Sequence, residues 1–398
     1  MKKKIMIYCQ HLAGMGHLVR CQEIIGSLIE DFEVCFISGG QKVPQFRLPS
    51  AVEVIYLPAI WQKGAELLPV DESMSLADVQ VQRKQMLIDA FNDFQPDCLM
   101  TECFPFSKLS MKAELKPLLK AAKTSARPVR IVCSLRDLVM TQPFSPEVRK
   151  RREAKISRLI NRFYDAILFH ADSHFQRLED CFATASQLKC EMVYTGYVAQ
   201  SPSADMLSDH SDFQASAPMI VVSAGGGRHG YPLLNAAIAA STALKDRLPH
   251  QFHLFAGPFM PEEDFNRLQQ SATGRENVRL CRYTPQLLNY LEAADLSISL
   301  GGYNTTMNLL RTGVRSLLLP SLNPSQTDEQ RIRAEKLSSM GLITLLSPGD
   351  LSTEHFSKAI ITASNKPKRT HEINLQGATN TATYLRKLLN PAPVTLAI

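Results

Sequence analysis

Three short glycine-containing stretches carry most of the residues that could do chemistry in this chain. The first, Gly14-Met15-Gly16-His17, follows an apolar run and precedes a helical pattern. Glycines allow a ligand to approach the backbone closely. The positive end of a helix dipole would keep a histidine at this position neutral and able to accept a proton. We therefore expect His17 to be a general base, with a capping or packing role as the alternative.

The other two stretches have the character of phosphate-binding turns. Gly225-Gly226-Gly227-Arg228 and Leu300-Gly301-Gly302-Tyr303-Asn304-Thr305 each follow a strand pattern and precede a helix pattern. Free backbone N–H groups and a helix dipole would then face an anion, and Arg228 could grip a diphosphate. The first of them matches neither the dinucleotide-binding pattern nor a P-loop. An ordinary tight turn is the alternative for both.

Charged residues near strand ends supply further candidates. Glu102, Arg136 and Asp137 follow strand patterns, and Arg20 lies one helical turn after His17. A local ion pair is the alternative for Arg136 and Asp137, and a surface helix position is the alternative for Arg20. The chain has no Asp-x-Asp sequence, so we expect no metal-binding carboxylate pair. Backbone N–H groups and arginine would meet the charge of a leaving diphosphate instead.

Alternating strand and helix patterns must position these residues. In the first half we predict a parallel sheet with right-handed crossovers and a loop over residues Trp61–Ser75. The strands are expected at Lys4–Cys9, Glu33–Ser38, Val52–Leu57, Asp97–Thr101, Val129–Ser134, Ala166–His170 and Met192–Thr195, and the helices at Leu18–Ile29, Leu76–Asp93 and Leu109–Lys123.

The pattern restarts after a segment rich in Ser, Asp, Ala and Pro. We predict a first domain at 1–199, a linker at 200–218, a second domain at 219–373, and a last helix and tail at 374–398 that could pack back on the first domain. A polar loop ending at Asp328-Glu329-Gln330 should follow the strand Ser316–Pro320. The fold class is therefore α/β with two doubly wound Rossmann-like domains, and the crevice between them is the expected ligand site.

Composition restricts the class of protein. The chain has 398 residues, is 45% hydrophobic and 21% charged, and lacks an apolar run of membrane-spanning length or a signal-peptide core. Its nine cysteines are scattered without a Cys-x-x-Cys pair, which disfavours disulfides and zinc and favours a reducing cytoplasm.

A basic amphipathic helix is the one strong charge feature. Its cationic residues are Arg149, Lys150, Arg151, Arg152, Lys155, Arg158 and Arg162. Contact with anionic lipid at the inner face of a membrane is one interpretation, and a solvated outer helix is the other. Nucleic acid is a less suitable partner, because no recognition motif accompanies the charge.

Several blocks together resemble the MurG-like glycosyltransferases, that is, glycosyltransferase family 28 and a related bacterial subgroup. The blocks are Gly14–Arg20, Phe104-Pro105-Phe106, Ser134–Asp137, Tyr194–Val198, Gly301–Thr306, Asn308–Gly313 and Asp328–Glu335. The resemblance implies a GT-B fold and a nucleotide-sugar, usually a UDP-sugar, bound as a substrate by the second domain without any cofactor. Tyr283 and Thr284 would hold the base, Gly302 and Thr305 the diphosphate, and Glu329 and Gln330 the sugar hydroxyls.

The expected activity is an inverting, metal-independent transfer of a sugar to a hydroxyl of a small-molecule or lipid-linked acceptor, with His17 as base. The chain departs from the family at Asn308, where the family has a glutamate that accepts both ribose hydroxyls. Two alternatives remain open. One is a nucleotide-sugar hydrolase, since Gly14–Cys21 resembles such enzymes. The other is a non-catalytic nucleotide-sugar-binding protein, which Asn308 favours.

Overall fold

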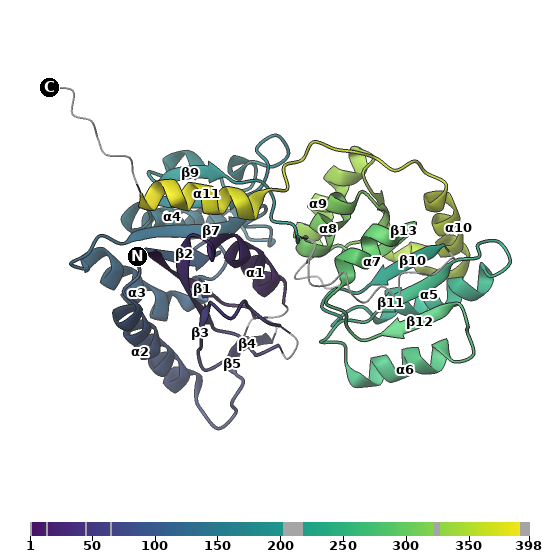
Figure 1. Cartoon of the computed structure of the whole chain (residues 1–398), viewed down its shortest axis with the longest axis horizontal. Coiled ribbons are helices and arrows are strands. Elements are labelled where there is room, and N and C mark those ends of the chain that lie inside the picture. Colours follow the sequence, from purple (N-terminus) through teal and green to yellow (C-terminus); the bar gives the residue numbers. More distant parts are fainter. Residues whose placement is uncertain are drawn as a thin grey trace. The chain divides into compact units, whose positions relative to one another are not determined.

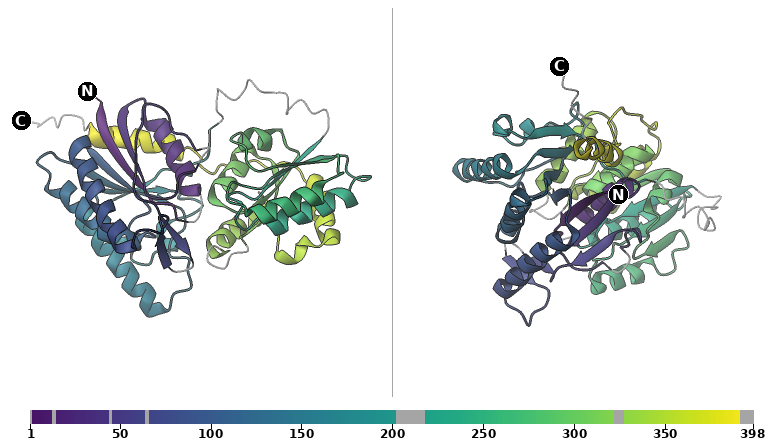
Figure 2. Two further views of the ribbon diagram at one scale, coloured as in Figure 1. Left: turned by 90° about the horizontal axis from the view of Figure 1, so that it is seen from below. Right: turned by 60° about the vertical axis from the view of Figure 1, so that its left-hand side comes forward.

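The computed structural model describes residues 2–12, 15–43, 46–63, 66–201, 218–321 and 327–390. The chain divides into two compact units, each built on its own parallel sheet with helices on both faces (Figures 1 and 2). The N-terminal unit comprises Met1–Ala199 and Ile373–Ile398, and the C-terminal unit comprises Gln200–Glu372.

The N-terminal unit is built on a seven-stranded sheet in the order β3-β2-β1-β6-β7-β8-β9. Apolar runs such as Ile5–Cys9 are buried on both faces, as expected for central parallel strands. The order reverses at β1, which places a switch point between β1 and β6. The strands are β1 Lys3–Cys9, β2 Phe32–Ser38, β3 Glu53–Tyr56, β6 Cys98–Glu102, β7 Arg130–Arg136, β8 Ala166–His170 and β9 Glu191–Tyr194.

Helices cover this sheet in two groups. Helix α1 packs beside α11, and α2 packs beside α3. Ser75 and Ser145 cap α2 and α4 by accepting hydrogen bonds from Asp78 N and Val148 N. The helices are α1 Gly16–Leu28, α2 Leu76–Phe94, α3 Lys112–Thr124, α4 Pro146–Phe163 and α11 Gly377–Leu389, with short 3-10 helices at Leu109–Met111, Leu178–Asp180 and Ala185–Gln187.

The last helix of the chain belongs to the first unit. Figure 1 shows α11, in yellow, among the elements of the N-terminal unit. Asn380 donates from Nδ2 to the carbonyl oxygen of Thr195 at 2.8 Å, and Arg386 forms an ion pair with Asp31 at 2.7 Å. Leu385 is fully buried.

Two connections of the N-terminal unit need a separate description: the segment before α2 and the segment between β2 and β3. The predicted loop at Trp61–Ser75 is wrong, because β4 Ile60–Lys63 and β5 Glu66–Pro69 form an antiparallel hairpin there. The strands are only four residues long and Pro69 ends the second, so the alternation was too short to show. The connection between β2 and β3 contains no helix in its described residues, 39–43 and 46–52.

The C-terminal unit is built on six parallel strands in the order β12-β11-β10-β13-β14-β15. Its strands are β10 Met219–Ser223, β11 Gln251–Phe255, β12 Val278–Cys281, β13 Leu296–Leu300, β14 Arg315–Leu319 and β15 Thr344–Leu345. Its helices are α5 Tyr231–Ala243, α6 Glu262–Ala272, α7 Leu287–Ala293, α8 Tyr303–Thr312, α9 Thr327–Ser339 and α10 Thr353–Ser364, with a 3-10 helix at Pro348–Leu351.

Some of these helices were not predicted. The expected polar loop through Asp328-Glu329-Gln330 is wrong, because these residues form the first turn of α9. Helix α6 was missed because it buries only Phe265 and Leu268, which leaves a sparse apolar pattern. Helix α8 ends at Gly313, which is in the left-handed conformation with φ 61°.

Among the helices that the structure describes, none combines the length and the apolar character needed to cross a bilayer.

Candidate functional site

The predicted catalytic residues of the N-terminal unit lie at one edge of its sheet. Strands β1, β6 and β7 are adjacent and parallel, so the segments that follow them meet at their carboxyl ends. Glu102 and Arg136 are the last residues of β6 and β7, and Asp137 follows directly. Helix α1 begins at Gly16, which is exposed, and Gly14 lies outside the described residues.

His17 and Glu102 are in direct contact at this edge. His17 Nδ1 lies 2.6 Å from Glu102 Oε1, and the two side chains are 17% and 0% exposed. A hydrogen on Nδ1 would be donated to the carboxylate, which leaves Nε2 as the nitrogen that accepts a proton. The structure thus joins two residues that the sequence proposed separately.

Arg20 is the third member of this cluster. Its side chain is 1% exposed, and its Nη2 contacts Glu102 Oε1. The alternative of a surface helix position is therefore wrong. The Cys103 thiol also donates to Glu102 Oε1, at 2.9 Å, and Lys108 is buried nearby. Sequence reasoning missed Cys103 and Lys108, although both lie in or just after the Glu102–Phe106 segment.

The surroundings determine the protonation state of the pair. Burial lowers the pKa of His17 to about 3, and the opposing attraction of Glu102 does not offset it. Burial alone would raise the pKa of Glu102, but the Arg20 guanidinium and the hydrogen bond from His17 outweigh burial and hold that pKa well below its usual value. We therefore assign a neutral His17 beside an ionised Glu102 whose charge is balanced by Arg20. The expected neutrality is retained, but burial replaces the helix dipole as the main cause.

His17, Glu102 and Cys103 also have the donor types of a metal site, and their ligand atoms lie within 4.8 Å of one another. In the metal-free protein, burial raises the pKa of the Cys103 thiol to about 11, so the thiol holds its proton. Arg20 already places a positive charge against Glu102 Oε1. We interpret the cluster as a proton-handling group.

The lowered pKa of His17 predicts an unusual pH dependence. A base with a pKa near 3 stays neutral as the pH falls from 7 to 5, so turnover should be insensitive to His17 protonation there. An unfolded chain would protonate this histidine below about pH 6.5. The stability that depends on neutral His17 is therefore complete above pH 6.5 and is lost as the pH falls towards 3.

Denaturant unfolding of the normal protein and of His17→Gln at pH 7.5 and pH 5 tests this direction of the pH dependence of stability. The normal protein should lose more unfolding free energy between the two pH values than the variant. Equal losses would mean that His17 is not held neutral by its surroundings.

In the C-terminal unit, the predicted donor residues follow the carboxyl ends of four parallel strands. These strands are β10, β12, β13 and β14 of one sheet. The two glycine turns converge on Thr305: a Cβ placed on Gly225 or on Gly302 would lie 3.9 Å from Thr305 Oγ1. Thr305 is 7% exposed and lies in the first turn of α8. The structure therefore brings the two predicted phosphate-binding turns together at the start of one helix.

The backbone requires glycine at two positions of the first turn. Gly225 and Gly227 have φ of 59° and 92°, and a Cβ on Gly227 would lie 2.3 Å from the carbonyl oxygen of Ala256. Gly226 accepts a hydrogen bond from Phe259 N at 2.9 Å. Sequence reasoning missed this supporting segment, although Gly257-Pro258 already marked a turn after β11.

The remaining predicted donor residues surround these turns. Arg228 is exposed, Asn304 is in the first turn of α8, and Gly301 is buried. Tyr283 is half-buried, which raises its pKa, and Thr284 Oγ1 accepts a hydrogen bond from Gln286 N at 3.1 Å. All of them lie at the carboxyl edge.

The first turn of α9 approaches the second glycine turn. A Cβ on Gly301 would lie 3.5 Å from Gln330 Oε1, which also accepts a hydrogen bond from Ser321 N at 2.8 Å. Glu329 forms an ion pair with the buried Arg333 at 2.8 Å. The polar groups of Glu329 and Gln330 are therefore held in place before any ligand arrives.

Asn308 is not presented as an open ligand group. It is 1% exposed, its Nδ2 donates to Gln200 Oε1 at 2.6 Å, and its Oδ1 accepts from Gln200 N at 3.4 Å. Gln200 thus occupies the polar atoms of the side chain that departs from the family pattern. A ribose would have to displace Gln200 to reach it.

Comparison with known proteins agrees with this arrangement. Residues 220–388 match the glycosyltransferase family 28 C-terminal domain. A curated relative is the UDP-N-acetylglucosamine–N-acetylmuramyl-(pentapeptide) pyrophosphoryl-undecaprenol N-acetylglucosamine transferase of Leuconostoc citreum, 24% identical over 138 residues. That match spans 34% of this chain and 37% of the relative, so little more than a third of the relative is covered.

Solved structures match over nearly the whole chain. MurG of Acinetobacter baumannii superimposes with a TM-score of 0.56 at 12% identity, covering 97% of this chain and 99% of that one. A putative UDP-N-acetylglucosamine 2-epimerase of Listeria monocytogenes gives 0.62 at 12% identity, covering 98% and 96%. At such identity these likenesses show the fold alone. The chain therefore has the GT-B fold, and its residues 220–388 match a glycosyltransferase family 28 C-terminal domain.

Proposed function

We propose that this protein is a glycosyltransferase that moves a sugar from a UDP-sugar to an acceptor hydroxyl with inversion and without a metal ion. The observation that carries the proposal is the buried contact of His17 with Glu102 and of Glu102 with Arg20. In this contact His17 is neutral, and its Nδ1 is held by the ionised Glu102 carboxylate. Its Nε2 is then unprotonated at neutral pH and can take the proton of a hydroxyl as that hydroxyl attacks.

The reaction then needs one displacement. The acceptor hydroxyl gives its proton to His17 Nε2 while its oxygen forms a bond to the anomeric carbon. The bond from that carbon to the diphosphate oxygen breaks, and the nucleoside diphosphate leaves with the electron pair. The backbone N–H group of Gly226 and the positive end of helix α8 would stabilise its charge, since the N–H groups of Gly225, Gly227 and Gly302 already donate within the protein. Glu102 keeps the imidazole oriented and stabilises the imidazolium that forms.

The donor assignment rests on the C-terminal unit. The match of residues 220–388 to a glycosyltransferase domain supports it, as does the convergence of both glycine turns on Thr305. In this proposal Tyr283 and Thr284 hold the base, and Glu329 and Gln330 hold the sugar hydroxyls. Asn308 would contact the ribose only after Gln200 moves away.

Hydrolysis of the nucleotide-sugar and binding without chemistry are the competing functions. The hydrogen bonds between Gln200 and Asn308 favour binding without chemistry, because they occupy the side chain that is expected to contact the ribose of the nucleotide-sugar. Incubation with a panel of UDP-sugars, first alone and then with mixed hydroxyl acceptors, distinguishes the three. Transfer predicts little free sugar until an acceptor is added, hydrolysis predicts prompt free sugar, and a binding protein gives affinity without turnover.

Thr305→Val tests the diphosphate site directly. The substitution keeps the shape of the side chain but removes the hydroxyl on which both glycine turns converge. Loss of one hydrogen bond to a charged group of about 1.5–3 kcal/mol should weaken UDP binding roughly tenfold to a hundredfold. Calorimetric titration with UDP measures this change in affinity, and Thr362→Val, at an exposed position of α10, is the control. If Thr305→Val binds UDP with unchanged affinity, the diphosphate does not bind at Thr305.

Contact with an anionic membrane is a further part of the proposal. Helix α4 buries Ile156, Leu159, Ile160 and Phe163 and leaves Lys150, Arg151, Arg158 and Arg162 exposed. The protein should sediment with phosphatidylglycerol vesicles at low salt and leave them at high salt. Neutralising Lys150, Arg151 and Arg158 with glutamine should abolish sedimentation, whereas neutralising the exposed Lys84, Lys120 and Lys358 should not. Failure to sediment at low salt supports the solvated-helix interpretation.

A further inference from the structure

The N-terminal unit contains a cavity of about 220 Å³ between α1, the paired strands β2 and β3, and the connection that joins those strands. Its floor is one face of the two strands. Phe36 pairs with Val54 and Ser38 with Tyr56, and alternate residues of a strand point to the same face. Leu18 of α1 forms one wall.

The missing helix between β2 and β3 explains this cavity. Parallel strands are normally joined by a helix that covers the face of the sheet. Here the described residues 39–43 and 46–52 form no helix, and the segment is tied down at separate points. Gln41 O lies 2.7 Å from His11 Nε2, and Arg47 O accepts from Gln22 Nε2 at 2.7 Å. The sheet face is therefore roofed by an irregular segment and is not filled by a packed helix.

The lining is mostly apolar with two cations. Leu18, Phe36, Val43 and Val52 are buried, and Leu48 and Val54 are partly buried. Lys42 and Arg47 also line the cavity and are exposed. Lys42 Nζ lies 4.2 Å from the centre of the Tyr56 ring, and Arg47 Nη1 donates to the carbonyl oxygen of the neighbouring Phe46 at 3.3 Å. An apolar cavity of ~150 Å³ already admits benzene. The available space therefore suits an aromatic or branched aliphatic group next to an anionic one.

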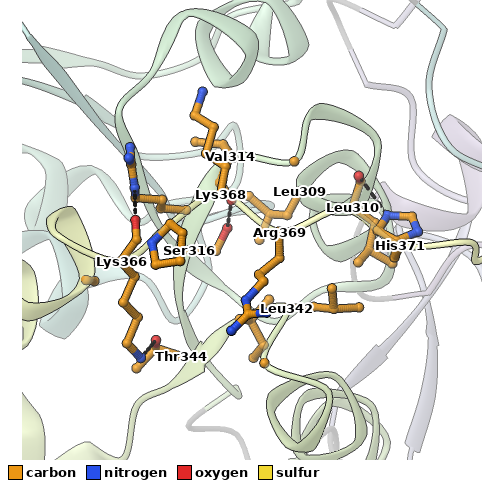
Figure 3. A pocket seen from close by; sticks show the side chains of 16 residues that line it. Leu309, Leu310, Val314, Ser316, Leu342, Thr344, Lys366, Lys368, Arg369 and His371 are labelled. Atoms are coloured by element: carbon orange, nitrogen blue, oxygen red, sulfur yellow. Dashed lines mark hydrogen bonds between the residues drawn. The ribbon is translucent and has the colours of Figure 1, made fainter.

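A second cavity, in the C-terminal unit, does not have these properties (Figure 3). It measures only about 30 Å³ and lies by Arg315, at the amino end of β14, the edge opposite the glycine turns. Figure 3 shows Lys368 and Arg369 pointing in different directions. Lys366 Nζ is taken by Thr344 Oγ1 at 2.7 Å, and His371 Nε2 lies 3.0 Å from the carbonyl oxygen of Leu310. Its cations do not converge on a ligand.

We propose that the 220 Å³ cavity binds the apolar body of the acceptor, and that Lys42 and Arg47 bind an anionic group on the same molecule. Leu18 directly follows His17 in the first turns of α1, so the cavity and the proposed base share one helix start. The acceptor class is then an amphipathic hydroxyl compound that carries a carboxylate or a phosphate. This inference rests on the proposed function only in calling the ligand an acceptor.

Two fluorescent probes with the same body test the cavity. Anilinonaphthalene sulfonate is anionic, and N-phenylnaphthylamine is neutral. Both should bind the full-length protein saturably at one site. Val54→Trp fills the floor and should weaken both probes at least tenfold, whereas Val81→Trp, at a 62% exposed position on α2, should weaken neither. Leu48→Trp fills the roof and serves as a second variant if Val54→Trp does not fold.

The charge of the cavity is tested by Lys42→Gln combined with Arg47→Gln. Neutralising two exposed cations should weaken the anionic probe by about threefold to tenfold and leave the neutral probe unchanged. Equal weakening of both probes would overturn the anionic part of the proposal. Probes that bind both tryptophan cavity variants as tightly as the normal protein would overturn the cavity itself.

Titration with UDP separates this inference from the proposed function. If UDP binds but the probes bind the tryptophan cavity variants as tightly as the normal protein, the cavity inference fails and the donor site stands. If the probes behave as expected while UDP does not bind, the glycosyltransferase proposal fails and the cavity stands as a ligand site. When both hold, the anionic probe should compete with the acceptor and not with UDP.

Discussion

His17→Ala is expected to lower turnover by roughly 10²–10⁴-fold, with the dissociation constant of the donor little changed. In the proposed mechanism His17 acts on the acceptor hydroxyl, whereas groups of the C-terminal unit bind the donor. His17 lies in the buried contact with Glu102, so no solvent base would reach the same position readily. Steady-state rates at saturating donor and acceptor, together with UDP titration, measure the two effects separately.

The matched control is His174→Ala, since His174 is 97% exposed in the same unit. It should keep normal turnover. If His17→Ala also keeps near-normal turnover, His17 is not the general base. Asp137, buried after β7, would then be the next carboxylate to replace.

Arg20→Gln is expected to destabilise the protein by about 3–5 kcal/mol, because it leaves the Glu102 carboxylate buried without its cation. It should also raise the pKa of His17, since the imidazolium becomes the remaining partner of that charge. Turnover in Arg20→Gln should therefore begin to fall at a higher pH than in the normal protein. Chemical denaturation and a pH–rate profile measure the two consequences.

A double variant distinguishes charge from packing. Arg20→Gln combined with Glu102→Gln removes both charges, so much of the lost stability should return while turnover remains low. Arg127→Gln, at a side chain 62% exposed in the same unit, should cost little. If the double variant is as unstable as the sum of its single variants, Arg20 stabilises the protein by packing and not by its charge.

The sequence predicted the strands of both sheets well, because parallel strands are continuous apolar runs. Ala166–His170 was predicted with its observed bounds. The edge position of Glu102 followed from its place after such a run. Burial of Arg20 could not be predicted, because its partner is 82 residues away and no local pattern reports that contact.

The errors have a common physical origin. The β4–β5 hairpin and helix α6 expose much of their surface, so their apolar residues are too few to mark a period. The occupation of Asn308 by Gln200 depends on a residue assigned to the linker, which has no pattern of its own. Contacts between distant segments therefore determined the parts of the site that the sequence missed.

The position of α11 has a consequence for biosynthesis. Residues 377–389 cover α1, whose His17 and Arg20 form the proposed catalytic cluster, yet the ribosome makes them after the entire C-terminal unit. The segment 200–372 is continuous and can complete its sheet first, which reverses the usual order in which domains mature during translation. An mRNA truncated before codon 377 would then yield a chain with a finished C-terminal unit and an uncovered α1, which chaperones and proteases would recognise.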